Sequence, residues 1–259
     1  ADYIFIRKSR NFLSSFMHIF LNLALAILSI GATVITGSCI IGLILVIASK
    51  WRIFAVNHRY WLLNIRSSLV DFIVGTSFVL LAYAAGTSFL PVHFALMAGY
   101  SVWLILIKPR SSTGWTIVQA IFAIILGTTA SIFAAISDSL VLVIASFIVG
   151  YAASHHVLVQ NDNRDASYLS LICGLVFAEI AWLSNNWLIL YTISNTGICL
   201  YQLSLVLSVI AFAYFRINTE ISTHGNKFKF KNVALPVLFC LLVVIVLIIG
   251  FSQPRFNIH

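Results

Sequence analysis

Charged side chains are scarce in this sequence. They make up 8% of its 259 residues, while hydrophobic residues make up 61%; soluble domains are about 25% charged and about 45–50% apolar. A soluble fold of this length has no means of hiding so much apolar surface. The composition therefore excludes a soluble domain and predicts an integral membrane protein.

Sequence patterns typical of metal sites, cofactor sites and catalytic centres are also missing. Four cysteines lie in or beside apolar segments without CxxC spacing: Cys39, Cys173, Cys199 and Cys240. This pattern predicts neither a disulfide framework nor a zinc site. Four histidines lie in predicted helices but without paired metal-ligand spacing: His18, His93, His155 and His156. Apart from Lys50, close to the end of an apolar run, no lysine lies inside a predicted helix to bind retinal. No Ser-His-Asp order, Gly-rich phosphate loop or HExxH motif occurs. We expect no metal, no cofactor and no catalytic centre.

Long apolar runs dominate what is present. A crossing helix needs about 20 predominantly apolar residues. Nine windows of this kind occur, at 12–31, 35–55, 67–86, 89–107, 115–136, 139–157, 167–185, 197–215 and 233–251. The predicted fold is an all-α polytopic bundle of about nine transmembrane helices over residues 1–259. The longest polar connection, Arg216–Asn232, is too short for a soluble domain.

The first pair of windows is ambiguous. Phe12–Ser49 contains no charged residue, so it forms either one long tilted helix, which would give eight crossings, or two helices joined by a turn. Gly31 and Gly37, with threonines between them, supply turn residues for the second alternative. A re-entrant first segment is a third arrangement. We do not expect a cleavable signal, because the apolar run far exceeds the 7–15 residues of a signal core.

Basic residues predict the orientation. With nine crossings, 14 of the 15 Lys and Arg residues lie on one side of the membrane, and only Arg255 lies on the other. The positive-inside rule therefore places this side, and the N-terminus, in the cytoplasm. The same distribution explains the net charge of +8 without a nucleic-acid partner, because the basic residues occupy short loops and not one face. Residues 185–197 are too short to cross and predict a re-entrant turn or an interfacial helix.

Small residues recur every four positions in two of the windows. One set is Ala123, Gly127, Ser131 and Ala135, and the other is Ser146, Gly150 and Ser154. Small residues on one stripe let helix backbones approach closely within lipid. We expect these stripes to be helix-packing surfaces, with a sliding or gating seam as the alternative.

Two acidic residues fall within the predicted spans, Asp71 and Glu179. Carboxyl groups at membrane depth are costly and mark functional sites by default. Glu179 lies far from either end of its window, which suits a proton-carrying or solute-binding carboxyl; the alternative is a structural Glu that pairs with Gln119 or Gln202. For Asp71 the expected partner is Arg66, in an ion pair at the cytoplasmic edge.

Residues 64–136 resemble part of a known transporter family. A helix opens with Asn64-Ile65-Arg66-Ser67-Ser68-Leu69, a later helix ends in the basic loop Lys108-Pro109-Arg110-Ser111-Ser112, and Gln119 is followed by Leu126-Gly127-Thr128-Thr129-Ala130. This order is similar to the membrane half of the fusaric-acid-resistance type aromatic acid exporters. The chain departs from that family in having too many helices and no large cytoplasmic domain. The resemblance covers about a quarter of the chain and implies an export function.

Two functions follow from these observations. The first is a small-solute transporter or permease, with a polar path lined by Glu179, Gln119, Gln202 and Asn22 and with Asp71 as a further candidate. The second is a non-catalytic membrane subunit or scaffold, whose polar groups satisfy one another. An intramembrane enzyme lacks a clustered nucleophile and base. The expected location is the cytoplasmic (inner) membrane of a prokaryote, and the expected partners are the lipid bilayer and either a second copy or other membrane subunits.

Overall fold

Seven long apolar helices form the body of the protein. The computed structural model describes residues 2–88, 90–134, 139–184, 189–192, 199–224 and 230–250. The long helices are α1 (Asp2–Thr36), α4 (Trp61–Ala84), α6 (Thr113–Ala134), α7 (Ser139–Gln160), α8 (Ala166–Ser184), α9 (Gln202–His224) and α10 (Phe230–Gly250). Within the described ranges, each contains a span long and apolar enough to cross a membrane. The chain is a multi-pass helical membrane protein, as predicted.

Two further apolar helices are shorter than the prediction requires. Helix α2 (Cys39–Ala48) has 10 residues, which span about 15 Å, half the thickness of the hydrocarbon core. Helix α5 (Pro91–Val102) continues through a π-helical turn, η2 (Trp103–Ile107). All nine predicted windows are thus helical over much of their length in the described residues, but seven have the length of a complete crossing. The window at 35–55 is the main correction, because a turn interrupts it and α2 ends at Ala48.

The turn at Gly37 separates α1 from α2. Gly37 adopts a φ of 63°, in the left-handed region that glycine enters without steric penalty. Ser38 then caps α2 by accepting a hydrogen bond from the backbone N–H of Ile40 at 3.3 Å. The predicted alternative of one continuous helix is wrong, and Gly31 lies inside α1 and not in the turn.

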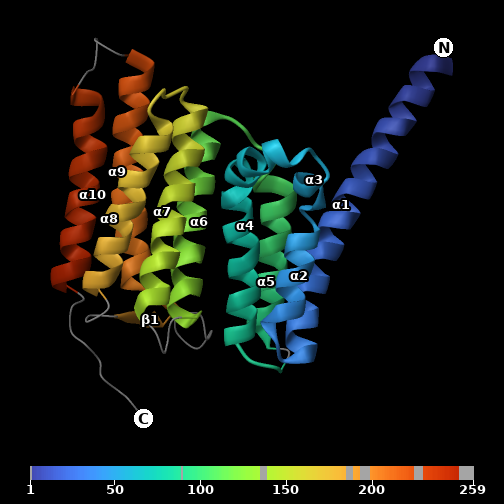
Figure 1. The fold of residues 1–259 in the computed structure, drawn as a ribbon, viewed down its shortest axis with the longest axis horizontal. Helices are drawn as coiled ribbons and strands as arrows, with labels where there is room; N and C mark the ends of the chain where they lie inside the picture. The colour runs from blue at the N-terminus through green and yellow to red at the C-terminus, as the bar shows by residue number, and fades with distance from the viewer. Residues whose placement is uncertain are drawn as a thin grey trace.

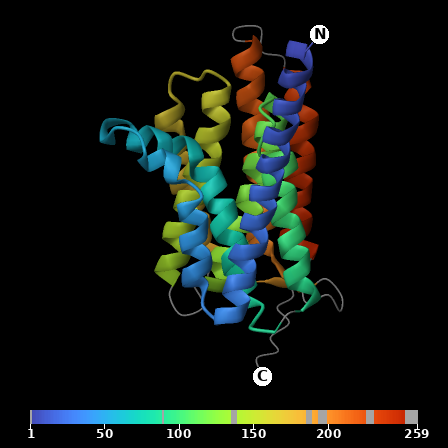
Figure 2. The ribbon, with the colours of Figure 1, turned by 90° about the vertical axis from the view of Figure 1, so that its right-hand side faces the viewer.

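The helices run alternately up and down, and their basic connections gather at one end. Figure 1 shows α1–α5 on one side of the molecule and α6–α10 on the other, with α4 at the edge of its group, next to α6. Helix α4 contacts α6 and α7, α8 packs mainly on α7, and α10 packs on α9. The connections that carry Lys50, Lys108 and Arg164 lie at the end where α1 begins, which we call the N-terminal end of the bundle. Figure 2 shows the segment with α3 (Trp51–Phe54) and the 3-10 turn η1 (His58–Tyr60) projecting sideways from that end.

A short hairpin departs from the predicted all-α fold. Strand β1 (Leu190–Thr192) pairs antiparallel with β2 (Cys199–Tyr201), and Leu190 lies opposite Tyr201. The prediction of a re-entrant turn or an interfacial helix over 185–197 therefore differs from the structure at Leu190–Thr192, and the rest of that range lies mostly outside the described residues. The window predicted at 197–215 begins as a strand and becomes helical at Gln202.

The small-residue stripes lie where helices approach one another. A Cβ added at Gly127 of α6 would lie 2.8 Å from side-chain atoms of both Ile73 on α4 and Val149 on α7. A Cβ at Gly150 of α7 would lie 2.6 Å from the ring of Phe177 on α8. Four other members are also buried: Ala123, Ser131, Ser146 and Ser154. Ala135 lies outside the described residues.

Candidate functional site

One carboxylate and two lysines form a cluster at the N-terminal end of the bundle. Asp71 lies on α4, accepts a hydrogen bond from the ammonium group of Lys50 and forms an ion pair with that of Lys108, whose nitrogen lies 2.6 Å from the same carboxylate oxygen. The indole Nε1–H of Trp103 donates to the other carboxylate oxygen at 3.0 Å. Asp71 is 13% exposed and Lys50 8%, whereas Lys108 is 41% exposed. Both oxygens of the carboxylate are therefore occupied, and one of its two cations remains open to solvent.

Three separate elements bring these side chains together. Lys50 follows α2, Asp71 lies ten residues into α4, and Trp103 and Lys108 lie at the start and just beyond the end of the π-helical turn η2. The backbone N–H of Lys108 donates to the carbonyl of Trp103, the five-residue bond of a π turn, at 2.9 Å. Such turns are rare and occur frequently at functional sites. Here the turn lets Trp103 and Lys108 reach the same carboxylate.

Gln119 of α6 forms hydrogen bonds with the backbone at the end of this π turn. Its side-chain Nε2 donates to the carbonyl oxygens of Ile107 at 2.8 Å and Arg110 at 2.7 Å. Its Oε1 accepts a hydrogen bond from Nε2 of His156 on α7, at 2.8 Å. Because a carbonyl oxygen only accepts, His156 carries a proton on Nε2. Gln119 is 4% exposed, so it fixes the backbone at the site and connects it to α7.

A pocket of about 230 Å³ lies beside the cluster. Its wall contains Ser67, Ser68, Val70, Asp71, Trp103, Lys108, Gln119 and His156. These residues come from α4, the π turn and its continuation, α6 and α7. Drug-sized ligands occupy pockets of about 300–1,000 Å³, so this pocket suits a smaller solute. Its polar wall contains one cation that faces solvent, Lys108.

The charges of the cluster do not cancel. Two ammonium groups surround one carboxylate, which leaves one excess positive charge when both lysines are protonated. Burial, and then the neighbouring Lys108 ammonium, lower the pKa of Lys50 to about 7. Burial also lowers the pKa of Lys108. The cluster therefore releases a proton far more readily than an exposed lysine does, and an added anion opposes that release.

Arg66 is not the partner predicted for Asp71. Its guanidinium lies over the ring of Tyr151 on α7, 5.3 Å from the ring centroid, an arrangement of the cation–π type. Residues five apart on a helix point about 140° away from each other, so Arg66 faces away from Asp71 along α4. The lysines that replace it come from connections distant in the sequence.

The other predicted polar residues do not form a path with this site. Glu179 is exposed on α8, and within the described residues no side chain donates a hydrogen bond to it. Gln202, at the opposite end of the bundle from Asp71, donates to the carbonyl oxygen of Leu247 on α10. Asn22 bonds with His18 on α1 at 3.1 Å. The structure brings together Asp71 and Gln119 alone among the predicted candidates, and the pairing of Glu179 with Gln119 or Gln202 is wrong.

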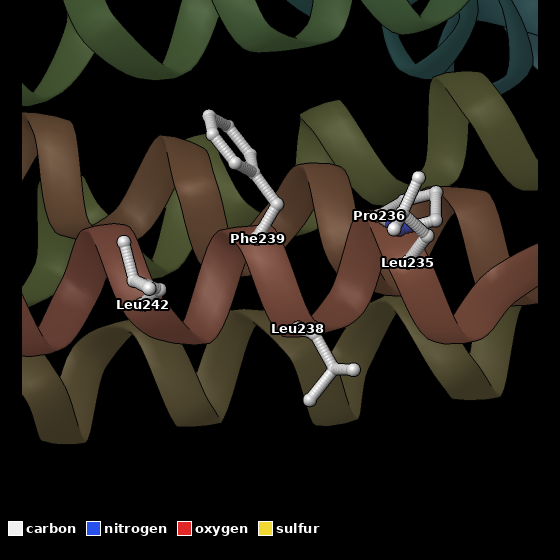
Figure 3. A pocket seen from close by; sticks show the side chains of 5 residues that line it. All are labelled: Leu235, Pro236, Leu238, Phe239 and Leu242. Atoms are coloured by element: carbon white, nitrogen blue, oxygen red, sulfur yellow. The ribbon is translucent and has the colours of Figure 1, made fainter.

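A second hollow lies on the outer surface of α10. It has a volume of about 490 Å³ and is lined by Leu235, Pro236, Leu238, Phe239 and Leu242. Figure 3 shows that these side chains all come from one helix and point in different directions around it, and no charged or polar side chain accompanies them. Four of the five are highly exposed apolar groups. Such a surface is suited to contact with acyl chains and offers no group that would orient a solute.

Sequence reasoning missed four members of the site: Lys50, Trp103, Lys108 and His156. The lysines were assigned to cytoplasmic loops by the positive-inside rule, which concerns topology and not pairing. His156 lacks the paired spacing of a metal ligand, and that spacing says nothing of a hydrogen bond to Gln119. The clearest available signal was the shortness of the connections after Ala48 and Ile107, which keeps both lysines close to the membrane-embedded carboxyl.

Comparison with known proteins adds no assignment to this geometry. No protein-family model matches the chain, and no curated protein or solved structure matches it. The similarity of residues 64–136 to aromatic acid exporters thus stays a prediction.

Proposed function

We propose that this chain is a permease for small organic anions and that a solute carboxylate binds at Lys108 in the pocket beside Asp71. The observation that carries the proposal is the cluster of two lysines around a single carboxylate at the wall of a pocket with several polar side chains. Its excess positive charge attracts an anion. The basic connections support a cytoplasmic position for this end of the bundle, so the solute would enter from the cytoplasm.

Lys108 is the group best placed to contact the solute. It lines the pocket and is 41% exposed, whereas Lys50 is almost fully covered. An entering carboxylate exchanges with Asp71 for the Lys108 ammonium, while Lys50 and the Trp103 indole continue to hold Asp71. The serine hydroxyls and the protonated Nε2 of His156 form the rest of the polar wall. Small size, negative charge and a compact polar head are thus the expected requirements.

Proton coupling follows from Lys50. With its pKa lowered to about 7, Lys50 loses its charge as the pH rises through neutrality. A bound anion stabilises the charged form and raises that pKa, so solute binding takes up a proton near neutral pH. The proton-carrying group in this proposal is a lysine outside the spanning helices, in place of the carboxyl of Glu179.

Binding of benzoate to purified protein tests the proposal. We expect benzoate to bind and benzamide, its neutral analogue of similar size, not to bind. The variant Lys108→Gln removes the accessible cation and should weaken benzoate binding by at least about tenfold, because a charge-assisted hydrogen bond contributes about 1.5–3 kcal/mol. Lys231→Gln is the matched control, since Lys231 is an exposed basic residue at the start of α10, outside the pocket wall. Equal affinities for wild type and Lys108→Gln would contradict the proposal.

One observation favours the alternative of a membrane subunit or scaffold. Glu179 points away from the bundle and has no partner among the described residues, which is typical of a surface that meets another chain. In a pure scaffold the Asp71 cluster would only join α4 to the connections after α2 and η2. Benzoate would then fail to bind wild type as well as Lys108→Gln.

A further inference from the structure

Helix α8 exposes a broad apolar face with one carboxyl in it. The helix packs mainly on α7, through a buried face of small residues and one ring: Ala166, Ser170, Gly174, Phe177 and Ala181. The opposite face is exposed and consists of Tyr168, Leu171, Ile172, Leu175, Val176, Glu179, Trp182 and Leu183. Every residue of that face except Glu179 is suited to contact with acyl chains. The two aromatic residues, Tyr168 and Trp182, lie near the ends of the face, as is usual at membrane surfaces.

Glu179 is poorly placed to reach water. It lies five residues, about 8 Å along the axis, from the end of α8 at Ser184. Side chains on a helix tilt toward its N-terminus, so this carboxyl points away from the nearer membrane surface and toward the bilayer centre. Charged or unpaired polar groups at this depth are costly and are usually paired within protein. A partner for Glu179 is needed, and the described part of the chain does not supply one.

We infer that the exposed face of α8 is the contact between two copies of this chain, with Glu179 of each copy meeting Glu179 of the other. In a two-fold dimer whose axis runs along the membrane normal, a residue on the axis meets itself at the same depth. Such a dimer therefore needs no residue of another kind to pair with Glu179. Two neutral carboxyl groups are self-complementary, because each donates one hydrogen bond to the other and accepts one from it.

The spacing on α8 fits a helix seam. Leu169, Ile172, Val176, Glu179 and Leu183 follow one another at steps of three and four residues, the spacing of core positions in a pair of helices packed at a small angle. A single polar residue in such a seam selects the register and the number of chains. Glu179 occupies one core position, and the remaining four are apolar.

Cysteine cross-linking in liposomes tests the contact. In a background with the native cysteines replaced by alanine, Leu183→Cys on α8 should cross-link between copies. Leu242→Cys on α10 is the matched control, since the two leucines are 56% and 59% exposed on apolar helices that do not share a face. Cross-linking at Leu183 and not at Leu242 supports the dimer. Equal cross-linking at both positions would indicate random collision and overturn it.

Variants at Glu179 test the role of the carboxyl, with subunit counting by single-molecule photobleaching at decreasing protein-to-lipid ratio. Glu179→Gln keeps a self-complementary side chain and should keep the dimer. Glu179→Leu should raise the dimer dissociation constant about 3- to 30-fold, the range for one polar contact between membrane helices. Glu179→Lys should give monomers because two ammonium groups repel each other.

Two results would refute the inference. Wild-type protein that is monomeric at every protein-to-lipid ratio would show that Glu179 does not meet a second copy, which is also the result expected if a basic helix of another protein is its partner. A dimer as tight in Glu179→Leu as in wild type would show that the carboxyl plays no part. Benzoate binding is independent of both results, because Glu179 is not in the pocket wall.

Discussion

Replacing Asp71 by asparagine should strongly destabilise the protein, because it leaves the buried amine of Lys50 without its counter-charge. The Lys50–Asp71 pair is 8% and 13% exposed, and breaking a buried pair costs about 3–5 kcal/mol. Lys108 is 41% exposed, so its contact with Asp71 adds less than about 1 kcal/mol. For a chain of this size, each kcal/mol lowers Tm by about 2–4 °C. We therefore expect Asp71→Asn to lower Tm by roughly 6–20 °C.

Thermal unfolding in detergent at neutral pH, followed by circular dichroism, measures this effect. A second variant isolates its cause: Asp71→Asn combined with Lys50→Met removes the buried charge together with its partner. Replacing a buried pair by apolar groups is often nearly neutral, so the double variant should regain most of the lost Tm. A loss below about 2 °C in Asp71→Asn, or a double variant no more stable than the single one, would refute the account of the cluster.

Three further predictions follow from the contacts described above. Benzoate binding to wild type should weaken as pH rises through about 7, where Lys50 loses its charge. Lys50→Arg should bind benzoate with little change from roughly pH 6 to pH 8, because arginine stays protonated. Binding by the arginine variant that still changes over this pH range would contradict the assignment of the titrating group to Lys50. Gly150→Leu should lower the free energy of unfolding by at least about 1–3 kcal/mol, because the new side chain meets Phe177. Gly114→Ala should not destabilise the protein, because a Cβ at Gly114 meets nothing within 4 Å. Similar losses of stability in both variants would be evidence against the tight α7–α8 contact. Gln119→Leu should lower the free energy of unfolding by about 1–3 kcal/mol, since it leaves backbone carbonyls at the π turn without their buried donor. An unchanged Tm in this variant would show that water replaces the side-chain amide.

Helix positions were predictable because apolar length leaves a strong signal in a sequence. The prediction failed where local backbone geometry decides the outcome. Residues 35–55 are predominantly apolar, yet Gly37 places a turn inside the window and α2 stops at Ala48. The strand pairing of Leu190–Thr192 with Cys199–Tyr201 is equally invisible to a hydropathy window, because three-residue strands carry no periodic pattern.

The partners of Asp71 were not predictable from local spacing. Its lysines lie 21 and 37 positions away, and their approach depends on how α2 and η2 end beside α4. The pairing with Arg66 was refutable from the sequence alone, because five residues along a helix place two side chains on different faces. Helical geometry therefore predicts partners for Asp71 in the loops and not at Arg66.

The direction of Glu179 was also available from the sequence. Ala166, Ser170 and Gly174 form a stripe of small residues on α8, and such stripes mark the face that packs against a neighbouring helix. Glu179 lies on the opposite side of the helix from that stripe. The small residues on its own helix therefore predict that this carboxyl lies outside the bundle.

Counterflow of radiolabelled benzoate into liposomes that contain purified protein tests the central claim most directly. We predict uptake driven by unlabelled benzoate inside the liposomes, no stimulation by internal benzamide, and a strongly reduced rate for Lys108→Gln but not for Lys231→Gln. Uptake by wild type no faster than in protein-free liposomes, with the protein folded and inserted, would contradict the claim that this bundle carries small anions.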